Sequence, residues 1–410
     1  MSCVRCAGLA QPVERLIRNH EVIGSSPISS SNPRRVSLAA GILRFSAYPP
    51  APPRILWKIR RRGDRMRQKR LGRQTVALER PPAVLAFANV GGKHEGEGPL
   101  REYFDELSQD SFFGEKTWEK AESAMQKRAL RRALGRAGLE AEDLDRVYAG
   151  DLLNQCIGSS FGLREFGIPF YGLYGACSTM GESLALAAMA IDGGFSDRCA
   201  ALTSSHFCTA ERQYRTPMPY GCQRAPTAQW TATAAGCTIL VRGDLAPSGC
   251  PGPWITHVTC GKIVDKGIRD PANMGAAMAP AAYDTLRAFF RETETKPSDY
   301  DGIFTGDLGA LGHEIVREFF ARDGVDLGDR FQDCGLLLYD RDRQDMHMGG
   351  SGCGCSASVF NGYLLERLRR GELRRIVFAP TGALLSPTSS FQGESVPGIC
   401  HAVCLTTVFR

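Results

Sequence analysis

From Ala83 onward the chain alternates between short apolar runs and segments with helical hydrophobic spacing. The run AVLAFANV, residues 83–90, predicts a strand that is buried on both faces. Thr117 to Gly138 carries apolar residues three and four positions apart and ends at a glycine, which predicts a helix. Further strands are predicted at 146–150, 169–175, 199–205 and 237–243. This alternation predicts an α/β fold with largely parallel sheets covered by helices.

The series of strands and helices begins again after a Gly/Pro-rich linker at 242–253. DLDRVYAGDL, residues 143–152, is matched by DYDGIFTGDL, residues 299–308, and RCAALTSSH is echoed by RIVFAPTGA. Several matched motifs at nearly constant offset predict a duplicated βαβ half. We therefore expect two similar halves, residues 81–241 and 254–410.

Residues 1–80 show no comparable pattern, and we expect them to be a disordered or mis-assigned N-terminal extension. Residues 1–65 mix Ser, Pro and Arg clusters and carry 12 Lys and Arg against 3 Asp and Glu. One interpretation is a mis-assigned start codon, with Met66 as the true beginning. The other is a basic arm that touches anionic lipid. Because the excess positive charge lies in this region, residues 81–410 are mildly acidic and show no nucleic-acid footprint.

Apolar runs and cysteine spacing exclude two further classes of protein. The longest apolar run, Leu184 to Ile191, is far shorter than the roughly 20 residues of a membrane-spanning helix. No signal peptide or lipidation motif is present, so we expect a protein kept on the cytoplasmic side of a membrane. The 15 cysteines are scattered, and the pair Cys353/Cys355 lacks the partner pair of a zinc site. We expect no metal site and no cofactor.

Cys177 is the sharpest candidate for chemistry. It follows a predicted strand and a Gly-Ala turn and precedes a helix, with Thr179 and Glu182 at capping-box spacing. A cysteine at a helix N-terminus feels the positive end of the helix dipole, which favours the thiolate. Such a residue, with Ser178 beside it, is a nucleophile or a small group lining an anion pocket. The alternative is a small residue chosen for a crowded turn.

Nine motifs in order resemble the stage V sporulation protein AD family of the thiolase superfamily. They are GDLLNQ, YGACSTMGE, DGGFSDR, TSSHFCTAERQYR, DPANMGAAMAPAAYDT, TGDLGALG, DCGLLLYD, GGSGCGCSA and TGALLSP. The resemblance runs from about Leu71 to the C-terminus. It implies a thiolase-like αβαβα five-layer fold built from two similar halves.

The same resemblance implies a function in spore formation. It implies binding of dipicolinic acid, with or without calcium, for uptake of calcium dipicolinate into the developing spore. The implied partners are membrane proteins of the stage V sporulation A transport complex, at the cytoplasmic face of the forespore inner membrane. A homodimer is left open, and no nucleic acid is expected.

The resemblance also places Cys177 at the nucleophile position of thiolase-fold acyltransferases. Active members pair that cysteine with a His or Asn. One such position falls in the GDL segment that precedes His313. The other falls in GGSGCGCSA, where this chain offers only Ser351 and cysteines. The missing companions favour a non-catalytic binding protein, and the alternative is an acyl-thioester acyltransferase that uses Cys177.

Three cationic groups are candidate partners for the ligand carboxylates. His206, Arg212 and Arg215 lie in SSHFCTAERQYR, a motif that ends a strand near the pocket in the resembled family. A planar dianion is held well by a guanidinium fork and a histidine. The alternative is a capping histidine with solvated arginines.

Two acidic loops and a small-residue run complete the candidates. Asp151 either lines the pocket, with calcium, or forms the N-cap or Asx-turn of the next helix. For Asp307, in the matching loop, the cap interpretation is favoured. The run that contains Gly350 and Ser351 either lines a pocket wall with its amides or forms a packed turn.

Overall fold

The first series of strands follows the predicted pattern closely. The computed structural model describes residues 69–214, 224–247, 250 and 252–408. The predicted strands at 83–90, 146–150 and 199–205 are confirmed within one residue at either end, whereas those predicted at 169–175 and 237–243 span Phe170–Leu173 and Ala234–Val241. The strands of this series are β1 (Thr75–Ala77), β2 (Ala83–Gly91), β3 (Arg146–Gly150), β4 (Phe170–Leu173), β5 (Arg198–Ser205), β6 (Trp230–Thr231) and β7 (Ala234–Val241).

The second series repeats the strand order of the first. Its strands are β8 (Trp254–Thr259), β9 (Gly302–Thr305), β10 (Phe331–Asp333), β11 (Gly350–Ser351), β12 (Arg375–Ala379), β13 (Thr381–Ala383), β14 (Gly398–Cys400) and β15 (Ala402–Thr406). The order β4-β3-β5-β7-β2 corresponds to β10-β9-β12-β15-β8. In each set the first three strands are parallel and the last two pairings are antiparallel. The prediction of largely parallel sheets is therefore wrong, because each set is mixed. Ala83 and Trp254 join the two sets between β2 and β8.

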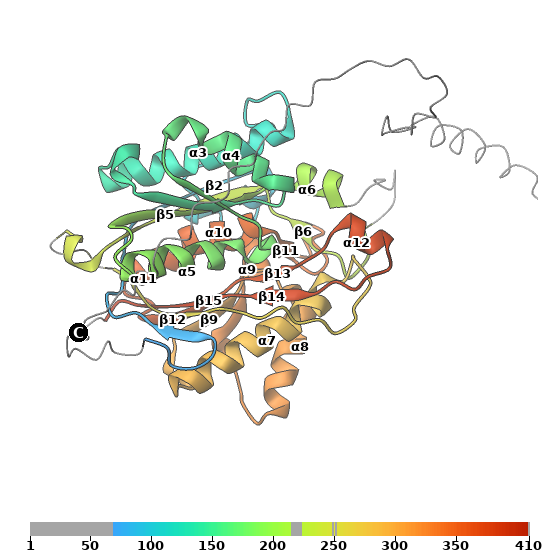
Figure 1. Cartoon of the computed structure of the whole chain (residues 1–410). Coiled ribbons are helices and arrows are strands. Elements are labelled where there is room, and N and C mark those ends of the chain that lie inside the picture. The colour runs from blue at the N-terminus through green and yellow to red at the C-terminus, as the bar shows by residue number, and fades with distance from the viewer. Residues whose placement is uncertain (1–68, 215–223, 248–249, 251, 409–410) are drawn as a thin grey trace, which may run out of the picture. The chain divides into compact units, whose positions relative to one another are not determined.

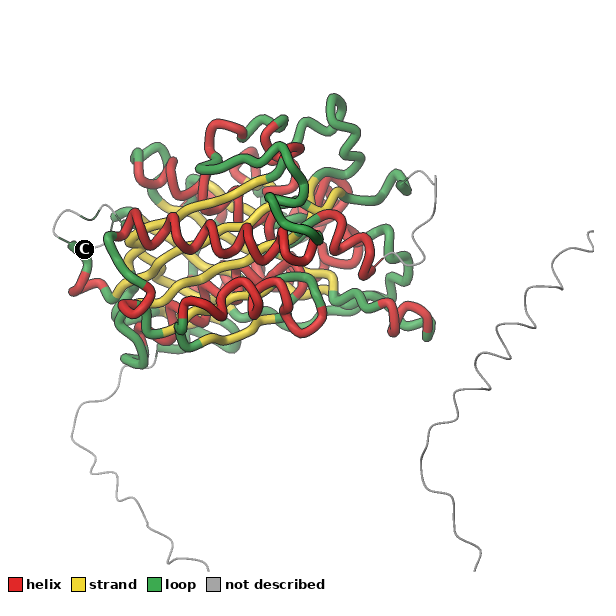
Figure 2. Tube along the Cα trace, turned by 90° about the horizontal axis from the view of Figure 1, so that it is seen from above, coloured by secondary structure: helices red, strands yellow, loops and turns green. Residues whose placement is uncertain are grey.

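Each set of strands forms one sheet layer. Helices cover the outer faces of the two sheet layers and fill the space between them. They are α2 (Lys93–Gly96), α3 (Trp118–Ala137), α4 (Ile157–Leu163), α5 (Thr179–Asp192), α6 (Phe207–Tyr214), α7 (Met274–Thr293), α8 (Gly309–Arg322), α9 (Cys334–Leu338), α10 (Cys353–Val359), α11 (Leu365–Arg369) and α12 (Pro387–Phe391). Figure 1 shows α3 and α4 on one outer face, α7 and α8 on the other, and α5 and α10 between the sheets. Seen from above in Figure 2, helices run alongside the strands. This is the predicted five-layer αβαβα arrangement.

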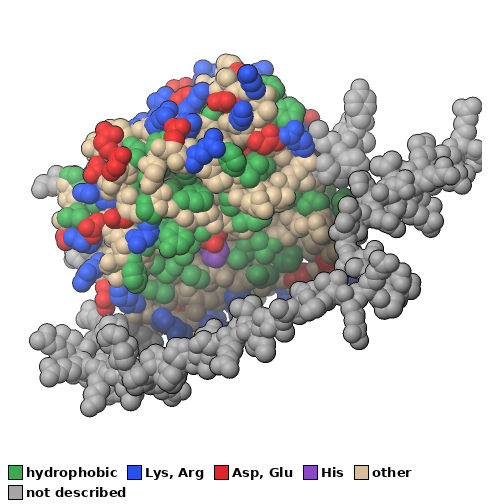
Figure 3. Space-filling view, turned by 45° about the horizontal axis from the view of Figure 1, so that its top comes forward, with side chains coloured by type: hydrophobic (Ala, Val, Ile, Leu, Met, Phe, Trp, Pro, Cys, Tyr) green, Lys and Arg blue, Asp and Glu red, His purple; other side chains and the backbone are tan. Residues whose placement is uncertain are grey.

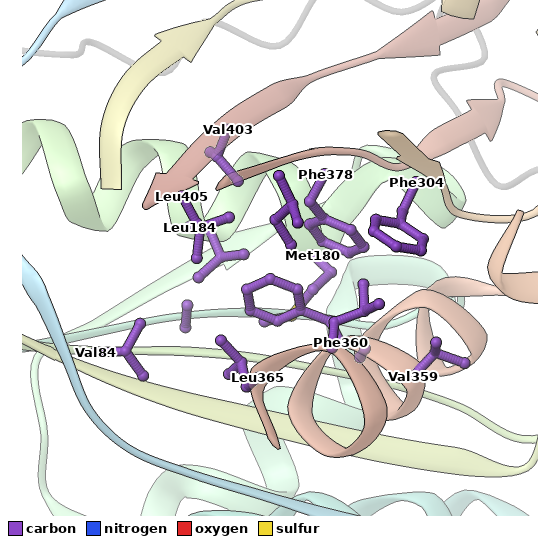
Figure 4. Packing of buried hydrophobic residues seen from close by; sticks show 14 of the residues in the cluster. Val84, Met180, Leu184, Phe304, Val359, Phe360, Leu365, Phe378, Val403 and Leu405 are labelled. Atoms are coloured by element: carbon purple, nitrogen blue, oxygen red, sulfur yellow. The ribbon is translucent and has the colours of Figure 1, made fainter. Parts of the chain in front are cut away.

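The space between the sheets is filled by a continuous apolar core. Met180 and Leu184 of α5 are fully buried and belong to the same cluster as residues of both sheets. Phe360 and Phe378 stack with ring centroids 4.4 Å apart. Figure 4 shows these side chains converging from the central helices and the strands. Because α5 is rich in alanine, it fits between two sheets that both approach it closely.

The predicted helix at 117–138 is confirmed together with both of its ends. Thr117 is the N-cap, and its hydroxyl accepts a hydrogen bond from the backbone N–H of Lys120. Gly138 ends the helix with φ +63°, a left-handed conformation that glycine adopts without a steric penalty. Ala121, Met125 and Ala129 are buried on one face, as the spacing predicts. Local sequence and tertiary packing therefore agree along this helix.

Residues 69–80 belong to the folded part of the chain rather than to the predicted extension. Strand β1 pairs with β8 in antiparallel register, and Leu78 is buried. The ammonium group of Lys69 lies 2.7 Å from the carboxylate of Asp192. The sequence does not signal this packing, because β1 is only three residues long and lies beside a run of basic residues. Residues 1–68 lie outside the described residues. Among the helices that the structure describes, none combines the length and apolarity needed to cross a membrane.

Candidate functional site

Cys177 lies where strand β4 gives way to the buried helix α5. It is the middle residue of a short 3₁₀ turn, η5 (Ala176–Ser178), that leads directly into α5. Ala176 has φ +52°, which is uncommon for a residue with a side chain. A Cβ atom at Gly382 would lie 2.6 Å from the carbonyl oxygen of Gly175, so only glycine fits there. The turn that carries Cys177 is therefore held tightly, as expected for a site residue.

The predicted capping box of α5 is wrong. The hydroxyl of Thr179 donates to the carbonyl of Ala176, and Ser178, the N-cap, donates to Gly175. Glu182 forms no bond to the helix start, and its Oε2 is buried without a hydrogen-bond partner. Both hydroxyls therefore bond to carbonyl groups of the tight turn, and neither caps the backbone N–H groups at the start of the helix. Ser178 lies next to Cys177, but its side chain is turned back into the turn.

Asp307 is the acidic side chain that faces Cys177. The hydroxyl of Thr381 donates to its Oδ1 at 2.8 Å, and Ser351 donates to its Oδ2 at 3.2 Å. The backbone N–H of Gly352 also points at Oδ2, at 3.3 Å. The Oγ of Ser351 is 3.9 Å from the Sγ of Cys177. Cys177, Ser351, Asp307 and Thr381 thus form one buried polar cluster, which we call the Cys177 cluster.

The prediction that Asp307 caps the following helix is wrong. The backbone N–H groups of Leu308 and Gly309, which begin α8, donate to the carboxylate of Asp333. Asp333, the last residue of β10, caps α8 in place of Asp307. The carboxylate of Asp307 therefore faces the cysteine instead. The sequence contained a signal for this role in the matched GDL loops, but it could not show which way the side chain points.

Burial dominates the protonation of this cluster. It raises the pKa of the Cys177 thiol well above its ordinary value, and the negative charge of Asp307 raises it further. Burial likewise raises the pKa of Asp307 to about 7, with the charge of Asp333 adding to the effect. The expectation of a thiolate favoured by the helix dipole is therefore wrong, because desolvation and a neighbouring carboxylate outweigh the dipole.

An apolar wall adjoins Cys177. Leu152, Ala210 and Cys353 pack with Cys177 as a buried group, and Tyr214 lies against it. The hydroxyl of Tyr214 donates to the carbonyl of Leu152 and lies 3.0 Å from the hydroxyl of Tyr174. The end of α6 therefore contributes aromatic surface next to the thiol.

His206 does not supply positive charge to the site. Its Nδ1 accepts a hydrogen bond from the backbone N–H of Cys208, and its Nε2 bonds the carbonyl of Ser111 at 2.8 Å. This pattern requires a neutral ring that carries its proton on Nε2. Burial lowers the pKa of His206, with the Ser111 bond opposing the effect. The prediction that His206 is a cationic ligand partner is therefore wrong. His206 is a buried, neutral residue that links the backbone of Ser111 to that of Cys208.

Arg212 pairs with residues of α3 and does not reach the Cys177 cluster. Its guanidinium forms an ion pair with Glu119 and lies over the ring of Trp118, 5.4 Å from the ring centroid. About half of the Arg212 side chain is exposed, so it lies at the surface of α3 and α6. Arg215, the third predicted cation, lies outside the described residues.

Asp151 belongs to a different buried network. Its Oδ1 accepts from the backbone N–H of Leu153, which is the predicted Asx-turn, and its Oδ2 accepts from the N–H and hydroxyl of Ser159. Gln126 donates to Ser159 and to Ser204, both at 2.8 Å, and Ser204 donates to Glu122. Burial and the charge of Asp151 raise the pKa of Glu122 to about 8. We call this group the Glu122 network; sequence spacing did not reveal it.

The small-residue run is both packed turn and site wall. Gly350 pairs with Trp230 between β11 and β6, and a Cβ there would lie 2.9 Å from the ring of Tyr339. The next residue, Ser351, contacts the Cys177 cluster through its hydroxyl. His313 is directed away, since its Nε2 bonds the carbonyl of Phe331 at 3.1 Å. The structure thus brings Cys177 and Ser351 together out of the predicted set, and adds Asp307 and Thr381.

The described surface and interior show no ready metal centre. Among the residues that the structure describes, no three His, Cys, Asp or Glu side chains gather so as to hold an ion. On the face seen in Figure 3, most blue and red side chains are intermixed. This face therefore presents little field of one sign to a charged polymer.

The protonation of the cluster makes a direct prediction about thiol reactivity. Iodoacetamide should alkylate Cys177 in the native protein far more slowly than the exposed Cys260. Asp307→Asn removes the carboxylate that raises the thiol pKa, so alkylation of Cys177 should become faster at mildly alkaline pH. Peptide mass spectrometry of timed samples measures both rates. Equal rates at Cys177 and Cys260 in the wild-type protein would contradict the buried, protonated thiol.

Solved structures of other proteins share the fold of this chain. 3-Oxoacyl-[acyl-carrier-protein] synthase III from Aquifex aeolicus is 11% identical, with TM-score 0.50, over 79% of this chain and 99% of that protein. Acetamide-bound OleA from Xanthomonas campestris is 13% identical, with TM-score 0.52, over 81% of this chain and 100% of that protein. At such low identity the likeness shows the fold alone. The chain is a thiolase-fold protein with a buried cysteine at the start of its central helix.

A closer relationship identifies the family. Residues 72–406 match the family described as stage V sporulation protein AD (SpoVAD). Stage V sporulation protein AD of Bacillus subtilis (strain 168) is 43% identical over 336 residues, which cover 82% of this chain and 97% of that protein. The chain belongs to the stage V sporulation protein AD family, and it is a sporulation protein, as the motifs predicted.

Proposed function

We propose that this protein binds dipicolinic acid at the Cys177 cluster without turning it over. The observation that carries the proposal is the carboxylate of Asp307 facing a buried, protonated thiol. A cysteine that attacks a thioester needs a lowered thiol pKa, or a neighbouring general base whose charge is balanced by a group of opposite sign. Here burial and Asp307 both act in the opposite direction. A site of this kind favours holding a small ligand over attacking a thioester.

Acyl transfer remains the second candidate because a carboxylate does lie beside the cysteine. Asp307 could accept the thiol proton only by leaving a thiolate in a fully buried site, where desolvation disfavours the charge. None of the main contributors to the pKa of Asp307 is cationic within the described residues. General acid–base assistance is worth roughly 10²–10⁴-fold in rate, but burial opposes the thiolate that such assistance would have to produce here.

Dipicolinate suits a small site made of hydroxyls, amides and an aromatic wall. Its carboxylates would accept from Ser351 and from amides at the start of α5, whose dipole favours negative charge. Its flat ring would lie against Tyr214 and Leu152. With His206 neutral and Arg212 paired to Glu119, we no longer assign the anchoring charge to those two residues.

Within spore formation, this binding would serve uptake of calcium dipicolinate into the developing spore. We propose that the protein acts with membrane proteins of the stage V sporulation A transport complex. It would work from the cytoplasmic side, as a peripheral protein of the forespore inner membrane. Family membership supports this place in the process.

Calorimetric titration separates the two candidate functions. We expect saturable binding of dipicolinate, with isophthalate, which lacks the ring nitrogen, binding more weakly. Parallel assays with acetyl-CoA and acetoacetyl-CoA should release no CoA above the background. Steady CoA release that Cys177→Ala abolishes would overturn the proposal in favour of acyl transfer. Titration with and without calcium then tells whether the anion or its calcium chelate is preferred.

A further inference from the structure

Asp307 presents a physical conflict with an anionic ligand. Its side chain is fully buried, it faces Cys177, and dipicolinate carries two carboxylates. An ionised Asp307 would repel such a ligand strongly, because charges in a buried site are poorly screened. Resting on the proposed function, we propose that Asp307 is a specificity residue that enters the complex as the neutral acid and donates a hydrogen bond to a dipicolinate carboxylate. Binding then takes up one proton from solvent.

The hydrogen bonds around Asp307 suit this role. Thr381 holds Oδ1 at 2.8 Å, which fixes the plane of the carboxyl group. Oδ2 receives only longer contacts, 3.2 Å from Ser351 and 3.3 Å from the N–H of Gly352. Oδ2 thus accepts longer bonds than Oδ1, and one of them comes from the Ser351 hydroxyl, which lies 3.9 Å from the thiol of Cys177. A proton on Oδ2 can turn from the Ser351 hydroxyl towards a ligand oxygen without disturbing Thr381.

Burial and the charge of Asp333 favour the neutral form of Asp307, and the hydrogen bonds with Cys177, Thr381 and the Gly352 N–H oppose them without cancelling them. From the packed elements its titratable neighbours are a carboxyl group and thiols: Asp333 (β10), Cys177 (η5), Cys334 (α9), Cys353 and Cys355 (α10) and Cys400 (β14). His313 of α8 acts on Asp333 rather than on Asp307. Burial raises the pKa of Asp307 to about 7, and a bound dianion would raise it further.

The consequence is a binding affinity that depends on pH with a defined sign. Below about pH 7 Asp307 is already protonated, so affinity is high and flat. Above about pH 7 each binding event must first supply the proton, and affinity falls up to about tenfold per pH unit. An acidic compartment would load the protein with dipicolinate, and an alkaline one would release it.

Calorimetry of the full chain in buffers of different ionisation enthalpy measures the proton directly. For dipicolinate we expect uptake of close to one proton at about pH 8 and close to none at about pH 6. Asp307→Asn, which is neutral at every pH, should show no uptake and a flat affinity profile. Glu122→Gln is the matched control, since Glu122 titrates near the same pH in the separate Glu122 network. It should keep the wild-type uptake.

The outcomes distinguish this inference from the proposed function. Binding by the wild-type protein without proton uptake at about pH 8 would overturn the role of Asp307 and leave dipicolinate binding intact. Wild-type uptake retained in Asp307→Asn would also overturn it. No binding by the wild-type protein at any pH would overturn the proposed function itself. If Asp307→Asn does not fold, the wild-type uptake alone decides.

Discussion

Cys177→Trp should abolish dipicolinate binding, with a loss of affinity of at least about a hundredfold. Cys177 is only 6% exposed and packs against Leu152 and Cys353, so an indole at this position would occupy the place proposed for the ligand. Overpacking of this kind costs about 1–3 kcal/mol of stability, which a domain of this size tolerates. Calorimetric titration measures the affinity, and thermal unfolding confirms that the variant is folded.

Two further variants make this result specific. Cys260→Trp adds the same indole at an exposed cysteine and should leave dipicolinate affinity unchanged. Cys177→Ala removes the thiol without adding bulk and should weaken binding only modestly. Unchanged affinity in folded Cys177→Trp would place the ligand elsewhere in the protein and leave the family and fold assignments standing.

Glu122→Gln should make the protein markedly less sensitive to alkaline pH. The pKa of Glu122 rises from 4.5 in the unfolded chain to about 8 in the fold, through burial and then the charge of Asp151. Its contribution to stability is therefore complete below about pH 4.5 and is lost as the pH rises towards about 8. We expect the variant to lose less unfolding free energy between about pH 5 and about pH 8, by roughly 3 kcal/mol.

Denaturant unfolding at a series of pH values measures this difference. Glu165→Gln is the control, because Glu165 lies at the surface, where hydrogen bonding to Lys127 lowers its pKa. Its pH profile in this range should follow the wild-type protein. If Glu122→Gln and the wild-type protein lost stability equally, the Glu122 network would hold no proton in the folded state.

Much of the fold could be predicted because local and tertiary signals agree. The strand over 83–90 and the helix between Thr117 and Gly138 carry unmixed hydrophobic periodicity and clear end signals. The matched GDL loops predicted the duplication that appears as two sets of strands in one order. Short pieces such as β1 escaped prediction, because three residues hold too little periodicity and gain their order by pairing with β8.

The site was predictable in position but not in chemistry. The sequence marked Cys177 and Ser351, because a tight turn before a helix and a small-residue run leave clear patterns. It could not show that Asp333 would cap α8 and thereby leave Asp307 facing the thiol. It could not show that both ring nitrogens of His206 would form hydrogen bonds with the backbone. Side-chain direction depends on contacts between residues far apart in the chain.

A crystal structure of the protein with dipicolinate tests the central claim most directly. We expect the ligand in the Cys177 cluster, with its ring beside Cys177 and one carboxylate within hydrogen-bonding distance of Asp307. A different location would contradict the account. The clearest such location is the cavity of about 380 Å³ beside β8, β15 and β12 that is lined by His257, Arg374 and Arg375. Dipicolinate found there, with the Cys177 cluster empty, would mean that the thiolase-type site of this protein does not bind it.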